Sequence, residues 1–457
     1  MKKSKEKNLF NREKGTTAFI TVGFAVLILF GTLLLSLPIS SAEGRFTSFS
    51  DSLFTATSAT CVTGLSVVDT ATYWSLFGQL VILGLIQIGG LGFMSLAFML
   101  SMIIKRRISP HERMLLMQSY NINNYENTLG FVKRIAKYTF GIEFVGALLL
   151  SFRFIPDFGW GNGIYKSVFH SVSAFCNAGF DIIGVGNPEI KAMSHYVADP
   201  LVNITLMLLI ALGGIGFVVV NDLSNCVKTK KRISVYTKIV LVLTVGLILS
   251  GALMFLGLEW NNPNTIGNKS LGEKILASFF HSVTLRTAGF SMIDNSMLTS
   301  GTQLMSMVFM FIGGASGSTA GGVKVVTVGV LVYTVICVAI GKRNVSIFGR
   351  KLSNESFMKA VTIVMIQFFL VILSTLIISV SMNTDVIKAA FESVSASGTV
   401  GLSLNFTPTL NTLSRFVVIF LMYFGRVGIL SITYTFTVNV RDEKSIITYP
   451  EANLLIG

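Results

Sequence analysis

The sequence contains few charged residues and few cysteines. Charged residues make up 13% of the 457 residues, about half the share of roughly 25% that is typical of soluble domains. The four cysteines form no CxxC pair and no cluster with histidine, so neither a disulfide framework nor a structural zinc site is expected. HExxH and the GK[ST] ending of a P-loop are also absent, and we expect no organic cofactor. These absences argue against an enzyme.

Long hydrophobic runs, in contrast, are abundant. Hydrophobic residues make up 52% of the chain, which has 36 phenylalanines and a mean hydropathy of +0.70. An apolar run of about 20 residues can cross a bilayer as a helix. We therefore expect one all-α integral membrane protein, surrounded by membrane lipid, with an even number of spans and both termini on one side. The eight candidate spans are 18–39, 78–104, 138–155, 201–221, 239–258, 303–341, 360–382 and 416–438.

The positive charge is concentrated in alternate polar segments. Of the 36 lysines and arginines, 25 lie in every second segment and 9 in the segments between, while Lys324 and Arg426 lie inside apolar runs. Because lysine and arginine accumulate on the cytoplasmic side of membranes, both termini are predicted to be cytoplasmic. The same rule accounts for the net charge of +14 without nucleic acid as a partner.

The segments on the predicted outer side repeat one pattern four times. Each has a moderately apolar stretch of about 10 to 15 residues, too short to span and typical of a re-entrant helix. Each stretch contains a phenylalanine ten residues before a glycine, which is followed by leucine or phenylalanine. The four sequences are FTATSATCVTGL (54–65), FHSVSAFCNAGF (169–180), FFHSVTLRTAGF (279–290) and FESVSASGTVGL (391–402). Their glycines are 115, 110 and 112 residues apart, which indicates internal repetition.

Glycine clusters follow each pattern within the next apolar run. They read GGLGF (89–93), GGIGF (213–217), GGASGSTAGG (313–322) and FGRVG (424–428). Each unit is therefore a span, a re-entrant helix, a glycine-bearing loop and a second span. Four such units predict a pseudo-fourfold arrangement around one pore. The predicted divisions are an N-terminus at 1–15, repeats at 16–108, 109–225, 226–341 and 342–440, and a C-terminal tail at 441–457.

The glycine-bearing loops are the candidate functional site. Non-helical backbone at membrane depth must be buried in protein or line a water-filled cavity, because free carbonyls in hydrocarbon cost several kcal/mol each. A ring of carbonyls can replace the hydration shell of potassium, and the C-terminal ends of the short helices favour a cation. No ring of carboxylates occurs there, which disfavours a calcium-type filter. The residues assigned to the filter are Val62, Thr63, Gly64, Asn177, Ala178, Gly179, Thr287, Ala288, Gly289, Thr399, Val400 and Gly401.

Glycine has a second use in membrane proteins, because small residues let helices pack closely. For the clusters at 89–93 and 213–217 we favour this close-packing interpretation. For the four loop glycines we favour the filter, because each stands in the same place after a short helix.

The motifs TCVTGL, FCNAGF, LRTAGF and SGTVGL, with GGASGSTAGGVK between the last two, closely resemble the bacterial Ktr potassium-translocating subunits of the Trk/Ktr/HKT superfamily. The resemblance covers nearly the whole chain. It implies four membrane–pore helix–membrane units, a homodimer with one pore per subunit in a bacterial plasma membrane, and a cytosolic ring of RCK-type nucleotide-binding regulatory subunits. It also implies potassium as the substrate and stimulation by sodium ions. In plant relatives a serine in place of the first filter glycine goes with sodium transport, whereas this chain has Gly64.

The apolar run 303–341 is far longer than a span and has a glycine-rich centre. Each glycine costs about 1 kcal/mol of helix propensity relative to alanine, so we expect a broken helix with a polar loop below the filter. The resemblance implies that this loop is a gate. Arg426 is expected to bond the carbonyls of the loop, although it could instead only fasten helices; Lys324 is expected to reach the membrane interface. The assigned gate residues are Gly313, Gly314, Ala315, Ser316, Gly317, Ser318, Thr319, Ala320, Gly321, Gly322, Lys324 and Arg426.

Several other charged residues lie near the predicted loops. Asp69, Asp181 and Asp294 follow filter glycines and would either concentrate cations at the outer mouth or be ordinary solvated carboxylates. Arg286 precedes the third filter segment, and we predict that it bonds filter carbonyls without touching the ion. Glu143, near the start of a span, is expected at the membrane interface.

The expected function is a gated potassium translocator. A sodium or mixed monovalent cation pore of the same fold is the alternative within transport. A carrier with alternating access would show two related halves with paired broken helices, whereas four repeats share one loop motif here. A receptor or scaffold without ion flux is the alternative from another class. The basic segments 105–137, 226–238 and 342–359 are the expected docking surface for a cytosolic partner.

Overall fold

A computed structural model describes residues 2–92, 128–187, 190, 192–230, 232–342 and 345–428. Within these ranges the fold is helical apart from one antiparallel ribbon, β1 (Ser346–Ile347) with β2 (Arg350–Lys351). The α-helices are α1 (Lys2–Ser36), α2 (Phe49–Thr60), α3 (Thr70–Tyr73), α4 (Leu76–Leu91), α7 (Thr128–Phe158), α8 (Trp160–Phe175), α9 (Pro200–Gly214), α10 (Phe217–Thr229), α11 (Val235–Glu259), α12 (Leu271–Thr284), α13 (Ser300–Phe311), α14 (Val325–Ala339), α15 (Asn354–Met382), α16 (Val386–Gly398) and α17 (Thr412–Val427). Short 3-10 helices are η1 (Pro38–Ser40), η2 (Met193–Tyr196), η3 (Asn295–Met297) and η4 (Thr407–Thr409).

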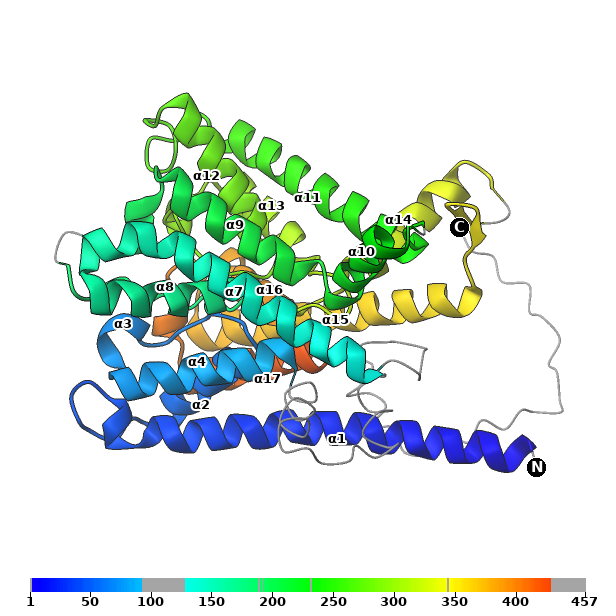
Figure 1. Ribbon diagram of the computed structural model, residues 1–457, viewed down its shortest axis with the longest axis horizontal. Coiled ribbons are helices and arrows are strands. Elements are labelled where there is room, and N and C mark those ends of the chain that lie inside the picture. Colours follow the sequence, from blue (N-terminus) through cyan, green and yellow to red (C-terminus); the bar gives the residue numbers. More distant parts are fainter. Residues whose placement is uncertain are drawn as a thin grey trace.

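Four of the described helices are individually long and apolar enough to cross a membrane. Their spanning segments are Phe19–Ser36 in α1, Gly130–Phe158 in α7, Val235–Glu259 in α11 and Asn354–Met382 in α15. They coincide with the first, third, fifth and seventh predicted spans. Figure 1 shows α1 along one edge of the bundle and α11 at the opposite edge, with the short helices between them. The helices are those of a multi-pass membrane protein.

A short helix follows each long helix and packs against it. The pairs are α1 with α2, α7 with α8, α11 with α12, and α15 with α16. The short helices have 12, 16, 14 and 13 residues, too few to cross a hydrocarbon core of about 30 Å at about 1.5 Å per residue. The structure therefore contains the four predicted short helices. Ser48 and Ser270 begin two of them by accepting hydrogen bonds from backbone N–H groups, as N-caps do.

The third short helix departs from the predicted spacing by one residue. The phenylalanines that define the spacing elsewhere are fully buried: Phe54, Phe169 and Phe391. In the third helix the buried residue is Phe280, at 1% exposure, and not the predicted Phe279, which is partly exposed. The turn after this helix is one residue shorter, because the amide of Ala288 bonds the carbonyl of Thr284, four residues back. The corresponding amides of the other three turns bond a carbonyl five residues back.

The helix after the second loop is bent. α9 and α10 cover most of the predicted span 201–221 and meet at 93°, and together they are long and apolar enough for one broken span or a re-entrant loop. The bend falls after Gly214, and Gly216 begins α10 with a left-handed φ of 89°. Such a φ is accessible to glycine at little cost, and it lets the chain turn sharply between α9 and α10.

The remaining second spans are broken or only partly described. α13 ends at Phe311 and α14 begins at Val325, so the predicted break within 303–341 is present. The inner parts of the predicted spans 78–104 and 416–438 lie outside the described residues. The same holds for the predicted C-terminal tail 441–457 and for most of the basic segment 105–137.

Three of the helices that follow the short helices approach the ends of those short helices at glycines. These second helices of their units are α4, α9 and α17. A Cβ atom at each of these glycines would lie far inside contact distance of a carbonyl oxygen. The distances would be 2.0 Å from Gly89 to Thr60, 1.9 Å from Gly213 to Phe175, and 2.2 Å from Gly425 to Ser397. The close-packing interpretation is therefore confirmed for Gly89 and Gly213, and it extends to Gly425.

Two glycines of α4 test this packing. Gly89→Ala should lower the midpoint of thermal unfolding in detergent, because the added methyl group forces α4 away from α2; overpacking of this kind costs about 1 to 3 kcal/mol. Gly84→Ala is the matched control, since a Cβ there meets nothing within 4 Å and gains up to about 1 kcal/mol of helix propensity. Equal midpoints for the two variants would contradict the packing.

Candidate functional site

Four loops at the C-terminal ends of α2, α8, α12 and α16 contain the residues assigned to the filter. In each loop the residue two before the glycine has left-handed backbone: φ is 57° at Val62, 60° at Asn177, 65° at Thr287 and 51° at Thr399. The glycines themselves have positive φ as well, at Gly64, Gly179, Gly289 and Gly401. Few non-glycine residues adopt this region. Its occurrence at the same place in all four loops indicates one shared local structure.

The four loops form a closed ring of contacts. A Cβ atom added to each of these glycines would lie within 2.6 Å of a carbonyl oxygen in another loop. That oxygen belongs to the residue just before the glycine of the other loop. The contacts run from Gly64 to Ala178, from Gly179 to Ala288, from Gly289 to Val400, and from Gly401 to Thr63. Because the fourth loop returns to the first, segments more than 100 residues apart in the sequence meet around one centre.

In each loop the amide of the residue before the glycine is bonded to the preceding helix. The residue before each glycine donates its N–H to a helix carbonyl, over 2.7 to 3.0 Å: Thr63 to Ser58, Ala178 to Ser173, Ala288 to Thr284, and Val400 to Ser395. The hydroxyls of Ser58 and Ser395 also accept from the N–H groups of Gly64 and Gly401, at 3.1 Å each. The backbone donors therefore point back into the helices.

The carbonyls of the same residues have no such partner. Thr63, Ala178, Ala288 and Val400 are fully buried, and their carbonyl oxygens accept no hydrogen bond from the described part of the chain. An unpaired buried carbonyl is costly, by about 1 to 3 kcal/mol in proteins. Four such oxygens around one centre, at the negative ends of four helices, have the chemistry that a dehydrated cation requires of its ligands.

Asn177 is the largest side chain among the assigned filter residues and is fully buried. Its amide nitrogen donates to the carbonyl of Arg286 at 3.3 Å, which ties the second loop to the third. Its amide oxygen lies 3.4 Å from the hydroxyl of Thr319, which in turn donates to the carbonyl of Phe175 at 3.1 Å. Asn177 therefore connects the ring of loops to the segment between α13 and α14.

The segment between α13 and α14, residues 312–324, lies against the ring. Its N–H groups bond the carbonyls of second helices: Ala315 to Gly214 at 3.0 Å, and Gly322 to Gly425 at 3.1 Å. A Cβ on Gly321 would lie 2.1 Å from the hydroxyl of Thr399, a filter residue. This segment thus touches the loops from the side of the second helices.

Arg426, at the end of α17, holds this segment through its guanidinium group. It donates to the carbonyls of Thr319 and Gly89, and to the carbonyl of Gly90 at 3.1 Å. The structure thus has the predicted contact with the glycine-rich loop, and it adds the end of α4 as a second partner. The guanidinium group of Arg426 therefore connects residues from the first, third and fourth units.

Two other basic residues differ from their predicted positions. Arg286 is buried at 6% exposure and donates to the carbonyl of Gly313 at 2.9 Å, so it bonds the 312–324 segment where a filter carbonyl was predicted. The ammonium of Lys324 donates to the carbonyl of Ala320 at 2.7 Å, so it folds back on its own segment where a position at the membrane interface was predicted. Both side chains therefore donate hydrogen bonds to carbonyls of the 312–324 segment.

Glu143 is buried, at 6% exposure, although the sequence predicted a position at the membrane interface. The side chain of Gln87 on α4 donates to its carboxylate oxygens at 3.1 and 3.3 Å. Cys176, next to the second filter segment, lies 3.9 Å from the same carboxylate. A partner on another helix, far away in sequence, satisfies the carboxylate and permits its burial.

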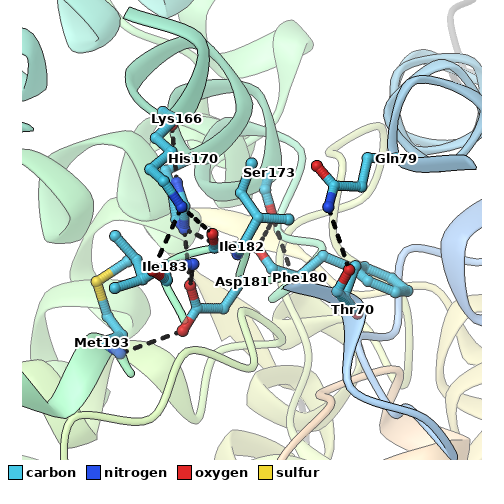
Figure 2. A network of polar contacts seen from close by, with 10 residues as sticks. All are labelled: Thr70, Gln79, Lys166, His170, Ser173, Phe180, Asp181, Ile182, Ile183 and Met193. Atoms are coloured by element: carbon cyan, nitrogen blue, oxygen red, sulfur yellow. Dashed lines mark hydrogen bonds and ion pairs between the residues drawn. The ribbon is translucent and has the colours of Figure 1, made fainter. Parts of the chain in front are cut away.

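The carboxylates after the filter glycines are engaged in local structure. Asp69 and Asp294 accept from backbone N–H groups at the starts of α3 and η3. Asp181 accepts from the His170 ring at 2.9 Å and from the N–H groups of Ile183 and Met193 (Figure 2). Burial alone would raise the pKa of Asp181, but these hydrogen bonds outweigh it and lower the pKa below its ordinary value.

One set of equivalent residues was not predicted from the sequence. The residue that follows the buried phenylalanine of each short helix is polar and buried: Thr55, His170, His281 and Glu392. The signal was present, because the sequence reads FT, FH, FH and FE at these places. The one-residue shift in the third unit hid the equivalence.

Comparison with known proteins gives consistent results. The family described as "TrkH: Cation transport protein" matches residues 3–446. The chain is 39% identical to the "Ktr system potassium uptake protein B" of Bacillus subtilis, with 96% of each chain covered. It is 38% identical to the "Potassium/sodium uptake protein NtpJ" of Enterococcus hirae, again with 96% of each covered.

A solved structure is similar in fold. It is the potassium transporter TrkH from Vibrio parahaemolyticus, with a TM-score of 0.69 and 16% sequence identity. The match covers 91% of this chain and 85% of that one. At this identity the likeness shows a common fold alone.

Arg286 provides a test of how the 312–324 segment is held. Arg286→Met should speed hydrogen exchange of the amides of 313–322, because the carbonyl of Gly313 loses its charged donor, a bond worth roughly 1.5 to 3 kcal/mol. Arg153→Met is the control, since its guanidinium pairs with Asp199 and Asp157 and leaves the segment alone. Unchanged exchange in Arg286→Met would show that Arg286 does not hold the segment.

Proposed function

The chain belongs to the TrkH family of cation transport proteins, and we propose that it is the potassium-translocating subunit of an uptake system. Membership of a transporter family agrees with the prediction that the chain is not an enzyme. One observation carries the proposal: the closed ring of four buried carbonyls that accept no hydrogen bond from the described residues. The potassium uptake named in the relatives supports the choice of ion.

The proposed selectivity filter consists of three residues from each loop. A potassium ion entering it exchanges water oxygens for carbonyl oxygens, and the ring favours potassium if it cannot contract around the smaller sodium ion. The bonds from the loop amides to the short helices support this, because they hold the loops back from the axis. The residues are Val62, Thr63, Gly64, Asn177, Ala178, Gly179, Thr287, Ala288, Gly289, Thr399, Val400 and Gly401.

The proposed gate is the glycine-rich segment 313–322 with Lys324 and Arg426. Its close approach to Thr399, and the Thr319 hydroxyl that faces both the carbonyl of Phe175 and the amide oxygen of Asn177, support this assignment. Two basic side chains in that region oppose the passage of a cation by electrostatic repulsion. Permeation then requires the segment and the Arg426 guanidinium to move together.

The remaining features of the proposal follow from the family. We propose a homodimer in a bacterial plasma membrane, with both termini cytoplasmic, regulated by a separate cytosolic ring of nucleotide-binding subunits and stimulated by sodium. The naming of relatives as parts of a Ktr system supports a regulatory partner. The proposed repeats are 16–108, 109–225, 226–341 and 342–440.

A second candidate function is transport of sodium as well as potassium. A relative with 38% identity is named a potassium/sodium uptake protein. The same ring of carbonyls would serve both ions if it were able to contract.

Growth and ion uptake in a bacterial strain that lacks potassium uptake systems test the proposal. The full chain, expressed with a family regulatory subunit, should restore growth at low potassium and take up potassium faster when sodium is present. Sodium uptake that exceeds potassium uptake would favour the second candidate. The absence of uptake of either ion, with the protein in the membrane, would contradict both.

Gly64 tests the filter. Gly64→Ser should lower the preference for potassium over sodium by roughly tenfold, or about 1.4 kcal/mol, because a Cβ there would lie 2.5 Å from the carbonyl oxygen of Ala178 and would displace the ring. Gly44→Ser is the control: Gly44 also has positive φ, at 68°, but nothing lies within 4 Å. The two variants would have equal ion preference if Gly64 were not part of a filter.

Arg426 tests the gate. Arg426→Ala should raise potassium flux several-fold, because it removes both a positive charge and the bonds that hold the 312–324 segment. Arg415→Ala is the matched control on the same helix, since Arg415 pairs with Asp51 at 2.6 Å and does not contact the segment. Unchanged or lower flux in a folded Arg426→Ala variant would contradict a gating role and favour a purely structural one.

A further inference from the structure

The four short helices carry a buried polar residue at one equivalent position. The residues are Thr55, His170, His281 and Glu392, each directly after the buried phenylalanine and between 0% and 5% exposed. Burying a polar side chain costs free energy unless it is hydrogen-bonded, so the partner of each residue indicates what the position does.

In the second unit this residue bonds the chain just beyond the filter. The ring of His170 lies 2.9 Å from the carboxylate of Asp181, two residues after the filter glycine (Figure 2). Its other nitrogen lies 2.7 Å from the carbonyl of Lys166. The backbone nitrogen of Ile182 also lies 3.4 Å from the ring nitrogen that faces Asp181, so the ring contacts the turn beyond the filter at two points. The Lys166 ammonium adds a second hold on the same turn through the carbonyls of Ile182 and Ile183.

The fourth unit makes the same connection with different chemistry. The carboxylate of Glu392 accepts from the hydroxyl of Ser403 at 2.8 Å, and Ser403 is again two residues after the filter glycine. Its other oxygen accepts from the hydroxyl of Thr407 at 2.5 Å. Both oxygens of a fully buried carboxylate are thus used to hold the outer chain.

The first and third units lack this connection. The hydroxyl of Thr55 has no partner within the described residues, and the ring of His281 turns to the hydroxyl of Ser306 on α13, at 3.1 Å. The ring of glycine contacts joins unit one to two, two to three, three to four, and four to one. The second and fourth units therefore face each other across it.

From this arrangement we propose that His170 and Glu392 are positioning residues that hold two opposite filter segments open by bonding Asp181 and Ser403. The inference rests on the proposed potassium filter and explains how it keeps its width. A carbonyl ring discriminates against sodium only while it resists contraction, and groups bonded behind the ring supply that resistance. His170 and Glu392 act on two units that face each other across the ring. They therefore resist contraction of the ring in that direction, although the equivalent side chains of the four units differ.

The test is the ion preference of the full chain in proteoliposomes, measured as competition of potassium and of sodium with radioactive rubidium uptake. His170→Phe and Glu392→Met should each reduce the preference for potassium over sodium by roughly five- to tenfold, the effect of about one buried hydrogen bond. Thr55→Val is the matched control at the equivalent position, and its preference should equal that of the wild type. Ion preference is the informative readout, because a loss of folded protein lowers uptake of both ions equally.

Ser403→Ala keeps the test decisive if the buried substitutions prevent folding. It removes the donor to Glu392 from a partly exposed turn, and it should shift the preference in the same direction. Wild-type preference in Ser403→Ala and in every folded variant of His170 and Glu392 would overturn the inference, as would an equal shift in Thr55→Val. If the wild type itself takes up no potassium, the proposed function fails; if it does and the variants match it, only the inference fails.

Discussion

The fold depends on one constraint, the need of backbone carbonyls at membrane depth for a partner. At Thr63, Ala178, Ala288 and Val400 the backbone leaves the helix, the amides turn back to the preceding short helix, and the carbonyls accept no bond from the described residues. In hydrocarbon such groups would cost several kcal/mol each. They lie at the negative ends of four helices, and under the proposed function a dehydrated cation supplies the partner that the protein does not.

The surrounding helices serve to bring these four loops together. Long helices position the short ones, and Gly89, Gly213 and Gly425 let the second helices approach the ends of the short helices. Backbone carbonyls of the 312–324 segment also lie outside any helix. Basic side chains donate the hydrogen bonds that these carbonyls accept. Arg286 and Arg426 donate to carbonyls of this segment, so two positive charges hold the segment beside the ring of loops. In the proposed function both the filter and the gate depend on backbone carbonyls that lie outside helices.

Much of this could be predicted from the sequence because backbone geometry restricts residue choice. A left-handed turn at a close contact favours glycine, so the four loop glycines appear as a repeated pattern, and the glycine-rich centre of 303–341 indicates a break in that one run. Properties that depend on a distant neighbour could not be predicted. Glu143 is buried because Gln87, 56 residues away, donates to it, and the partners of Arg286 and Lys324 are loop carbonyls whose positions only the fold determines. The shift to Phe280 arises from a turn one residue shorter, which identical spacing in the sequence concealed.

The most direct test is to locate a monovalent cation in the structure. Crystals of the protein soaked in thallium, which substitutes for potassium and scatters anomalously, should show a peak enclosed by the carbonyl oxygens of Thr63, Ala178, Ala288 and Val400. Replacement of thallium by sodium should abolish or displace that peak. An anomalous map with no peak at this centre, in a protein whose four loops remain in contact, would contradict the account.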